Sequence, residues 1–248
     1  MVSYDELGAR IIISFGDGSV FITESTLWGL IVAAILAVLG IWLGSGLEKI
    51  PKGKQVIAEF IVGWLYKFTD ANLGKEHRGY APYIGTIFGF ILLGSSLGIF
   101  GIRPITASLN VTAALAVLTF LRIQSSAIRT HGVKGRIKEM CEPYPFMFPL
   151  EVIEACTLPV SLALRLFGNI LGGLIVVELW MHLMEYLSSL VCNVPFLRAV
   201  TVLPINAFFD MFEPVIQTYI FTLLTMINLY TAIKVTESHG QLAQGNRK

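Results

Sequence analysis

The amino-acid sequence predicts an all-α integral membrane protein in which about five membrane-embedded helices accompany one interfacial amphipathic helix. Hydrophobic residues make up 54% of the 248 residues and charged residues only 14%, whereas soluble domains carry about 25% charged residues. Several apolar segments reach the roughly 20 residues that a bilayer-spanning helix requires. We therefore treat the chain as one membrane domain, whose net charge of +1 argues against a nucleic-acid partner.

Three apolar segments of ordinary length come first. They cover residues 27–47, 81–102 and 107–128, after an N-terminal stretch, 1–26, that we place outside the cell. Each can cross a hydrocarbon core about 30 Å thick as one helix. Residues 52–75 are too charged to cross, yet their apolar residues recur at helical spacing. This pattern predicts an amphipathic helix that lies in the cytoplasmic interface.

The last two apolar segments are longer than the membrane is thick. Residues 150–186 would form about 55 Å of helix and residues 204–233 about 45 Å, at 1.5 Å per residue. Such helices either break or lie strongly tilted. Pro159 and Pro214 are candidate kinks, but neither has loop-like neighbours. We favour two long, strongly tilted helices packed as a hairpin.

Basic residues predict the orientation of the chain. Because lysine and arginine concentrate on the cytoplasmic side of membrane proteins, the connections that carry them are placed there. Arg10, Arg103 and Arg198 fall on the other side, and Arg165 lies within a span. Five crossings then put the N-terminus outside and the tail, 234–248, in the cytoplasm. The cytoplasmic set is Lys49, Lys52, Lys54, Lys67, Lys75, Arg78, Arg122, Arg129, Lys134, Arg136, Lys138, Lys234, Arg247 and Lys248.

Polar residues inside the two long segments fall on defined helix faces. At 100° per residue, one face of segment 150–186 carries Arg165 together with Glu151, Glu154, Ser161 and Asn169. A second polar face, nearer the external end, carries Glu178, His182 and Glu185. The last segment has a matching stripe of Asn206, Asp210, Glu213, Gln217 and Asn228. If the hairpin turns near residues 194–195, Glu178 and Asp210 lie at similar depth and could share a transferable proton.

Each of these groups also has a purely structural interpretation. An arginine inside a membrane costs several kcal/mol at least, so it either serves an ion path or forms a salt bridge with Glu151, Glu154 or Asp210. Asn169 and Gln217 can simply join two helices. His182 and Glu185 can lie among external headgroups. Glu151 and Glu154 can be acids favoured in the first turn of a helix.

The sequence contains no recognisable apparatus for covalent chemistry. Neither GDGS at 16–19 nor GKEHRG at 74–79 has the P-loop pattern, and no HExxH, Cys–His cluster or GxSxG is present. Cys141, Cys156 and Cys192 match no metal-binding spacing. We therefore expect no catalytic residue, metal or cofactor, and a carrier of ions in place of an enzyme.

Several motifs together resemble the membrane subunit a of F-type ATP synthases. The most specific is PVSLALRLFGNILGG at 159–173, followed by RPITASLNVTAALAV at 103–117, HGVKGRIK at 131–138, PFMFPLEVIE at 145–154 and IQTYIFTLLTMINLY at 216–230. The resemblance covers about residues 27–235. It implies a non-catalytic subunit of a bacterial plasma membrane complex, which couples the flow of ions, protons or Na⁺, to ATP synthesis. The implied partners are a ring of c subunits, the peripheral-stalk subunit b, other ATP synthase subunits and the lipid bilayer.

The resemblance also implies roles for individual residues. Two offset half-channels would lead to the c-ring, with Arg165 between them facing the ring carboxylate. Asn169 and Gln217 correspond to the family's asparagine and glutamine near this arginine, and Ser161 and Glu151 fall on positions that are polar in relatives.

The chain departs from the family pattern at three positions. Leu174 replaces the usual Glu or His, Ser108 stands where relatives often have Asp, and Leu158 where they often have a base. We expect Asp210 with Glu178 to serve the outer path in place of Leu174.

A second hypothesis is a self-contained secondary transporter in which Arg165 binds a substrate carboxylate. Transporters of this kind show internal repeats and broken helices near the midplane. The sequence has no such repeat, so we favour the first hypothesis.

Overall fold

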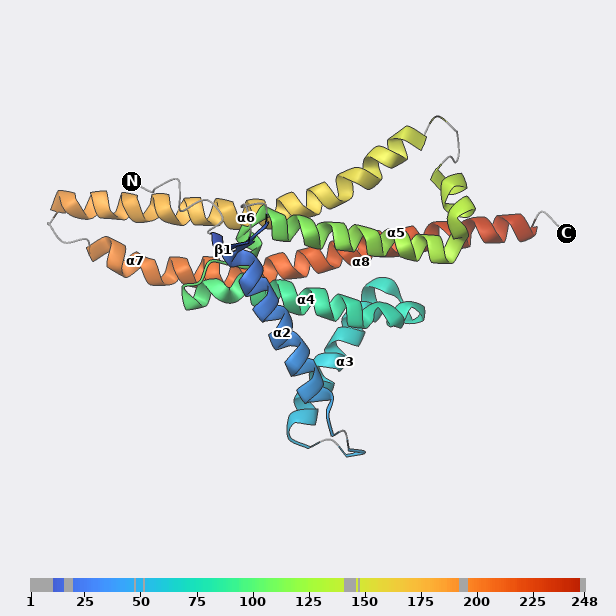
Figure 1. The fold of residues 1–248 in the computed structure, drawn as a ribbon, viewed down its shortest axis with the longest axis horizontal. Helices are drawn as coiled ribbons and strands as arrows, with labels where there is room; N and C mark the ends of the chain where they lie inside the picture. The colour runs from blue at the N-terminus through green and yellow to red at the C-terminus, as the bar shows by residue number, and fades with distance from the viewer. Residues whose placement is uncertain are drawn as a thin grey trace. The chain divides into compact units, whose positions relative to one another are not determined.

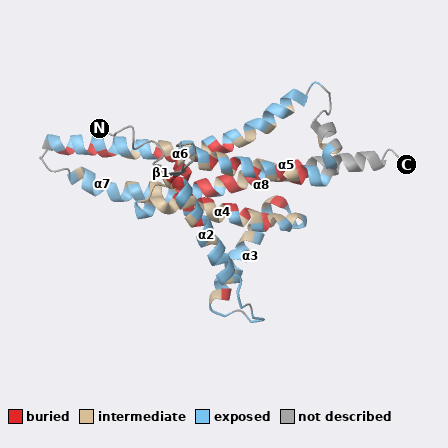
Figure 2. Cartoon of the chain, in the orientation of Figure 1, coloured by how far each residue is buried: buried red, intermediate tan, exposed pale blue. Residues whose placement is uncertain are grey.

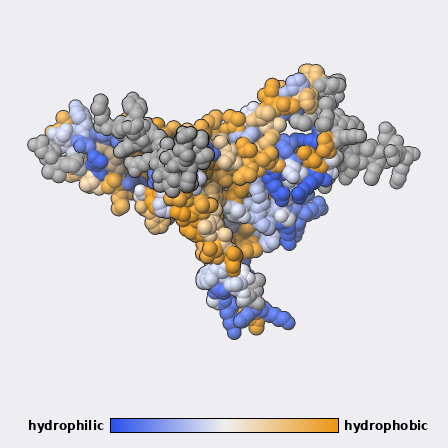
Figure 3. All heavy atoms as spheres, viewed as in Figure 1, coloured by the Kyte–Doolittle hydropathy of each residue, from blue (hydrophilic) through white to orange (hydrophobic). Residues whose placement is uncertain are grey.

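The computed structural model describes residues 11–15, 20–46, 48–50, 52–140, 146, 148–191 and 196–245. Within these ranges, five helical stretches are long and apolar enough to cross a membrane: Glu24–Gly44, Lys75–Phe100, Leu109–Thr130, Phe148–Leu190 and Phe196–Ile233. The predicted fold class, an all-α integral membrane protein, is confirmed. Figure 3 shows broad apolar areas on the face in view, as expected for a chain that lipid and other membrane proteins surround.

A short β-hairpin precedes the first helix and was not predicted. Strands β1 (Ile11–Phe15) and β2 (Val20–Thr23) pair antiparallel. Helix α2 (Glu24–Gly44) follows at once, because Thr23 acts as its N-cap and accepts a hydrogen bond from the backbone N–H of Thr26 at 3.4 Å. Residues 1–10 and 16–19 of the predicted external stretch lie outside the described residues.

The chain forms two compact units. The first unit consists of Met1–Ser45, Thr86–Thr112 and Leu164–Tyr219, and the second of Gly46–Gly85, Ala113–Ala163 and Ile220–Lys248. Helices α4 (Ala81–Ser95), α5 (Leu109–Met140), α6 (Phe148–Val191) and α8 (Glu213–Gly245) each contribute residues to both units. Figure 1 labels these helices along the chain.

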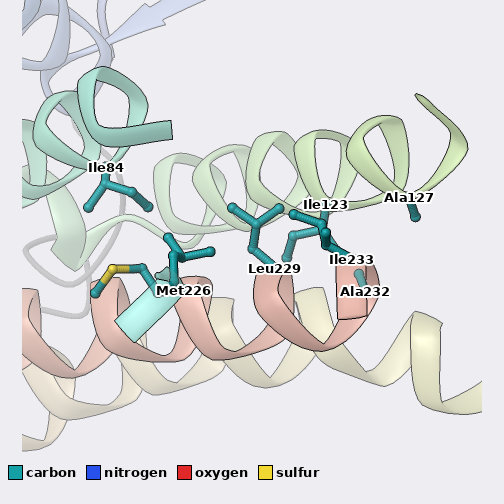
Figure 4. Packing of buried hydrophobic residues seen from close by; sticks show 8 residues of the cluster. Ile84, Ile123, Ala127, Met226, Leu229, Ala232 and Ile233 are labelled. Carbon is teal, nitrogen blue, oxygen red and sulfur yellow. The ribbon is translucent and has the colours of Figure 1, made fainter. Parts of the chain in front are cut away.

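The second unit is held together by an apolar core. Figure 4 shows this core, in which Ile84 of α4 and Ile123 of α5 pack with Met226 and Leu229 of α8. Helix α3 (Lys54–Leu73), the interfacial helix of the prediction, adds the buried Leu73. The 3-10 segment η1 (Lys75–Tyr80) then returns the chain to α4.

An ion pair and a cation–π cluster fix the polar rim of the second unit. The Nε of Arg78 donates to the Asp70 carboxylate at 2.8 Å, and this hydrogen bond lowers the pKa of Asp70. The Arg122 guanidinium lies 5.5 Å from the ring centre of Tyr80 and 5.6 Å from that of Tyr83. Such contacts between a cation and an aromatic face are attractive and stabilise the charged side chain.

Two short helical turns interrupt the first unit between α4 and α5. Segment η2 (Ser96–Phe100) and segment η3 (Ile105–Ala107) are both 3-10 helices. Ile105 is fully buried beside Gly94, whose missing side chain makes room for it. Helix α5 continues to Met140, beyond the predicted 107–128, and breaks at Gly132, whose φ of 70° is a conformation that favours glycine.

Helix α6 is unbroken over 44 residues and contains Pro159. Helix α7 (Phe196–Ala207) runs beside the second half of α6 (Figure 1). The backbone N–H of Leu197 donates to Ser188 Oγ at 3.1 Å, and Arg198 pairs with Glu185 at 2.8 Å. A hairpin therefore joins these two elements.

The last predicted helix, 204–233, is longer and less regular than the sequence indicated. It consists of α7, a π-helical segment η5 (Phe208–Phe212) and α8. Helix α8 extends through residues 234–245, which the sequence placed in a tail. Figure 2 colours most of α7 as exposed, so this part of the hairpin has little cover within the chain.

Candidate functional site

Arg165 lies near the middle of α6, just inside the first unit, and is half-buried. The residues next to it in sequence, Leu164 and Leu166, are apolar, and Leu166 is fully buried. Among the described residues of the first unit, no carboxylate forms an ion pair with Arg165. A salt bridge between Arg165 and Asp210 is therefore absent among the described residues of this unit.

One turn after Arg165, α6 and α8 are joined by a pair of amides. The Asn169 Nδ2 donates to Gln217 Oε1 at 2.6 Å. Asn169 is exposed, whereas Gln217 is only 1% exposed. The structure thus brings together two of the residues that the sequence singled out, on segments 48 positions apart.

Gln217 leaves a polar atom unsatisfied. Its Nε2 is buried and has no hydrogen-bond acceptor among the described residues. A buried donor without an acceptor costs about 1–3 kcal/mol. Such a group in a folded protein points to a water molecule or another ligand at the same place.

A cavity of about 270 Å³ opens next to this amide. Three stretches of the first unit form its walls. They are the end of α4 with η2, the middle of α6, and the continuous helical stretch from the end of α7 through η5 to the start of α8. Two carboxylates, Asp210 and Glu213, are half-buried in this wall. The lining residues are Ser95, Gly98, Gly101, Pro104, Ile170, Gly173, Leu174, Val177, Asn206, Phe209, Asp210, Glu213, Pro214 and Gln217.

Proline 214 explains why the helix changes geometry at Asp210. A proline has no N–H to donate to the carbonyl four residues earlier, and its ring clashes with that carbonyl. Four residues before Pro214 stands Asp210, and the π-helical segment occupies Phe208–Phe212. The wider π turn accommodates the clash, and such turns often occur at functional sites.

The predicted partnership of Glu178 with Asp210 is not what the geometry shows. The Glu178 Oε1 lies 3.1 Å from His182 Nε2, one turn further along α6, and both side chains are more than half exposed. Glu178 is also not among the cavity-lining residues. The carboxylate that accompanies Asp210 at the cavity is Glu213.

Three other candidate residues belong to the second unit. Glu151, Glu154 and Ser161 lie in the first half of α6, where Glu151 is half-buried and the other two are exposed. Neither glutamate forms a side-chain hydrogen bond or ion pair with another described residue of that unit. The structure therefore gives the two acids no partner among these residues.

Sequence reasoning missed the contribution of the connection between α4 and α5. Gly98, Gly101 and Pro104 line the cavity, although residues 96–107 were divided between two predicted spans and a loop. The glycine-rich run GSSLGIFG was the available signal, because glycines allow close approach of another backbone or side chain.

Comparisons with a family profile and with individual proteins point to the same family. The profile of the family described as ATP synthase A chain matches residues 26–230. ATP synthase subunit a of Moorella thermoacetica is 36% identical over 217 residues, which cover 87% of this chain and 92% of that protein. A protein of Propionigenium modestum, named ATP synthase subunit a, sodium ion specific, is 31% identical over 86% of this chain and 74% of its own length. ATP synthase subunit a 3 of Pelobacter propionicus is 33% identical over 84% of this chain and 86% of its own length.

Proposed function

Because the chain belongs to the family of ATP synthase A chains, we propose that it supplies two offset half-channels through which ions reach and leave a ring of c subunits. The coarser role follows from the family itself. The chain is a non-catalytic, multi-pass membrane subunit of an ATP synthase and acts in its ion-translocating part.

The observation that carries the proposal is the surroundings of Arg165. A charged side chain inside a membrane span is costly, and such residues are almost always paired or line an ion path. Arg165 has no carboxylate partner among the described residues of its own unit, and the Asn169–Gln217 pair lies one turn away. The partner that would satisfy it is a carboxylate of a c subunit, which the arginine would draw into its ionised form.

We assign the remaining polar residues to the two sides of Arg165. Asp210, Glu213 and Gln217, with the cavity that they line, form the outer half-channel. Glu178 and His182, exposed and paired, mark its external mouth. The acids Glu151 and Glu154, with Ser161, line the cytoplasmic route. Arg165 separates the two routes and prevents direct leakage.

The orientation and partners complete the proposal. The N-terminus faces outward and the C-terminus the cytoplasm of a bacterial plasma membrane, as the distribution of basic residues favours. Besides the c-ring, the chain would contact the peripheral-stalk subunit b. The ion is a proton in our proposal. Since one relative is named sodium ion specific, pumping should be compared in media with and without Na⁺.

Replacing Arg165 by Ala tests this function. The variant complex should assemble but lose ATP-driven pumping and ATP synthesis, because nothing would draw the c-subunit carboxylate into its ionised form or block leakage. Pumping is measured by quenching of an acidification dye in inverted membrane vesicles. The matched control is Arg198→Ala, which removes an exposed arginine paired with Glu185 and should pump normally.

Two results would contradict the proposal. Coupled pumping at the normal rate by the Arg165→Ala complex would remove the assigned role of the arginine. Solute exchange catalysed by the purified chain alone in liposomes would favour the transporter alternative, in which Arg165 binds a substrate carboxylate.

A further inference from the structure

Each cavity carboxylate lies against a glycine of another element. A Cβ atom added to Gly98 of η2 would come within 2.6 Å of Asp210 Oδ1 and 3.1 Å of its Cγ. A Cβ added to Gly173 of α6 would come within 3.0 Å of Glu213 Oε2 and 2.8 Å of Phe209 Cδ1. Non-bonded heavy atoms prefer separations of about 3.5–4.0 Å, so a methyl group at either glycine collides with the structure as it stands.

The backbone around Gly98 has little freedom to retreat from such a collision. The Gly98 carbonyl accepts a hydrogen bond from the N–H of Gly101 at 2.8 Å, and the Leu97 carbonyl accepts one from Ile102 at 3.2 Å. Gly101 itself holds a φ of 70°. The two ends of the connection are joined by the buried pair Ser95 Oγ and Thr106 Oγ1, 3.0 Å apart. The Asp210 side chain is therefore the part that must move.

An independent feature points to a ligand in this cavity. Gln217, a residue only 1% exposed, lines the same cavity, and its buried Nε2 has no acceptor among the described residues. A water molecule or hydrated ion in the cavity would satisfy it. The positions of the two carboxylates then decide how that ligand is held.

We propose that Gly98 is a positioning residue for Asp210, and that η2 is the third wall of the outer ion path. The absent side chain of Gly98 leaves the space in which the Asp210 carboxylate lies, and Gly173 does the same for Glu213. This inference rests on the proposed function, because it assigns Asp210 to the path of the translocated ion. It adds a residue that the RLFGN motif and the polar stripes of the two long helices do not contain.

A double-mutant cycle between Gly98 and Asp210 tests the inference. Passive ion flux is measured in vesicles stripped of the ATP-hydrolysing portion, for Gly98→Ala, Asp210→Ala and the double variant. Gly98→Ala should lower the flux at least about tenfold, because misplacing a reacting group by an ångström costs up to about a hundredfold. In the Asp210→Ala background the collision is gone, so Gly98→Ala should change the flux by less than about twofold.

The controls are glycines with open space around their Cβ positions. Gly79→Ala lies in another 3-10 segment, and Gly40→Ala lies in the middle of α2; neither would meet an atom within 4 Å. Both should keep normal flux. If the Gly98→Ala complex fails to assemble, restored assembly in the double variant supports the collision with Asp210.

The inference is overturned by any of three results. The first is normal flux in the Gly98→Ala complex. The second is that Gly98→Ala lowers the flux by the same factor in the Asp210→Ala background as in the wild type. The third is that neither the Gly98→Ala complex nor the double variant assembles. These outcomes differ from failure of the proposed function, which is judged by coupled pumping in Arg165→Ala. The Gly98→Ala and Asp210→Ala changes could lower the flux independently while the Arg165→Ala complex is still uncoupled. That result would remove only the positioning role of Gly98.

Discussion

At the scale of single residues, the site is defined by polar groups that lack partners. Arg165 has no carboxylate in the described part of its own unit, and the Nε2 of Gln217 has no acceptor. A charged or polar group without a partner costs free energy in an apolar environment. If Arg165 and Gln217 only joined helices, partners within the chain would satisfy their polar atoms, as Glu185 satisfies Arg198. The unsatisfied groups therefore support the proposed assignment of Arg165 and Gln217 to the ion path.

Gln217→Leu should separate stability from ion flow. The change removes the hydrogen bond from Asn169, worth about 1 kcal/mol, and also the buried donor that costs about 1–3 kcal/mol. These effects offset, so the thermal midpoint of the purified complex should change little. Pumping should fall at least about tenfold if Gln217 belongs to the path.

The control for this change is Thr231→Val, which deletes a side-chain hydrogen bond to Ile227 on the same helix away from the cavity. It should leave both pumping and the thermal midpoint unchanged. A Gln217→Leu complex that is strongly destabilised yet pumps normally would make Gln217 a structural residue.

At the scale of elements, the irregular parts of the helices build the cavity. The π-helical segment η5, the 3-10 segment η2 and the glycine at position 173 of α6 all meet there. A continuous α-helix through residues 204–233 would present Asp210 and Glu213 differently, because one extra residue in a turn rotates all that precedes it by about 100°. The deviations from regular geometry thus decide which carboxylates share the cavity.

Pro214→Ala should rebuild a regular helix at the expense of function. Alanine supplies an N–H for the Asp210 carbonyl and is about 3 kcal/mol more favourable than proline inside a helix. The thermal midpoint should therefore be unchanged or higher, while the Asp210 side chain turns away from the cavity and passive flux falls at least about tenfold.

Pro204→Ala is the matched control, because Pro204 lies inside α7 and does not line the cavity. Its flux should stay normal. Equal flux in the wild-type and Pro214→Ala complexes would show that the π-helical segment does not depend on Pro214 or that the position of Asp210 is unimportant.

At the scale of the whole molecule, the chain is a set of membrane helices that cover themselves incompletely. Only 6% of the most apolar windows of Glu24–Gly44 and of Phe196–Ile233 is buried within the chain. Lipid and the other subunits of the ATP synthase must cover the rest. The charge distribution, with most lysines and arginines in alternate connections, predicts how this set is oriented.

Labelling of single cysteines tests the orientation. After Cys141, Cys156 and Cys192 are changed to Ser, Ser3→Cys should react with a membrane-impermeant maleimide added to intact cells. Asn246→Cys should react only in inverted vesicles, because the tail is predicted to face the cytoplasm. Labelling of both positions from the same side would contradict five crossings, which place the two termini on opposite sides of the membrane.

The sequence by itself determined the class of the protein and its most informative residue. Apolar segments long enough to span a bilayer, together with a low charge content, leave few folds available, so the helical membrane class followed from composition and length. Arg165 could be singled out because a charge in such a segment is rare and costly. The pairing of Asn169 with Gln217 was also within reach, since both lie on the polar faces of the two long helices.

Only the tertiary structure decided which acids lie at the cavity. A helical wheel assumes regular geometry, so it could not register the π-helical segment at Asp210, and it paired Asp210 with Glu178, whereas Glu178 contacts His182. Nor could periodicity place Gly98 against Asp210, because that contact joins residues more than 100 positions apart through a non-regular connection. Local patterns report the apolarity of each segment, whereas the close approach of distant side chains depends on how irregular turns pack.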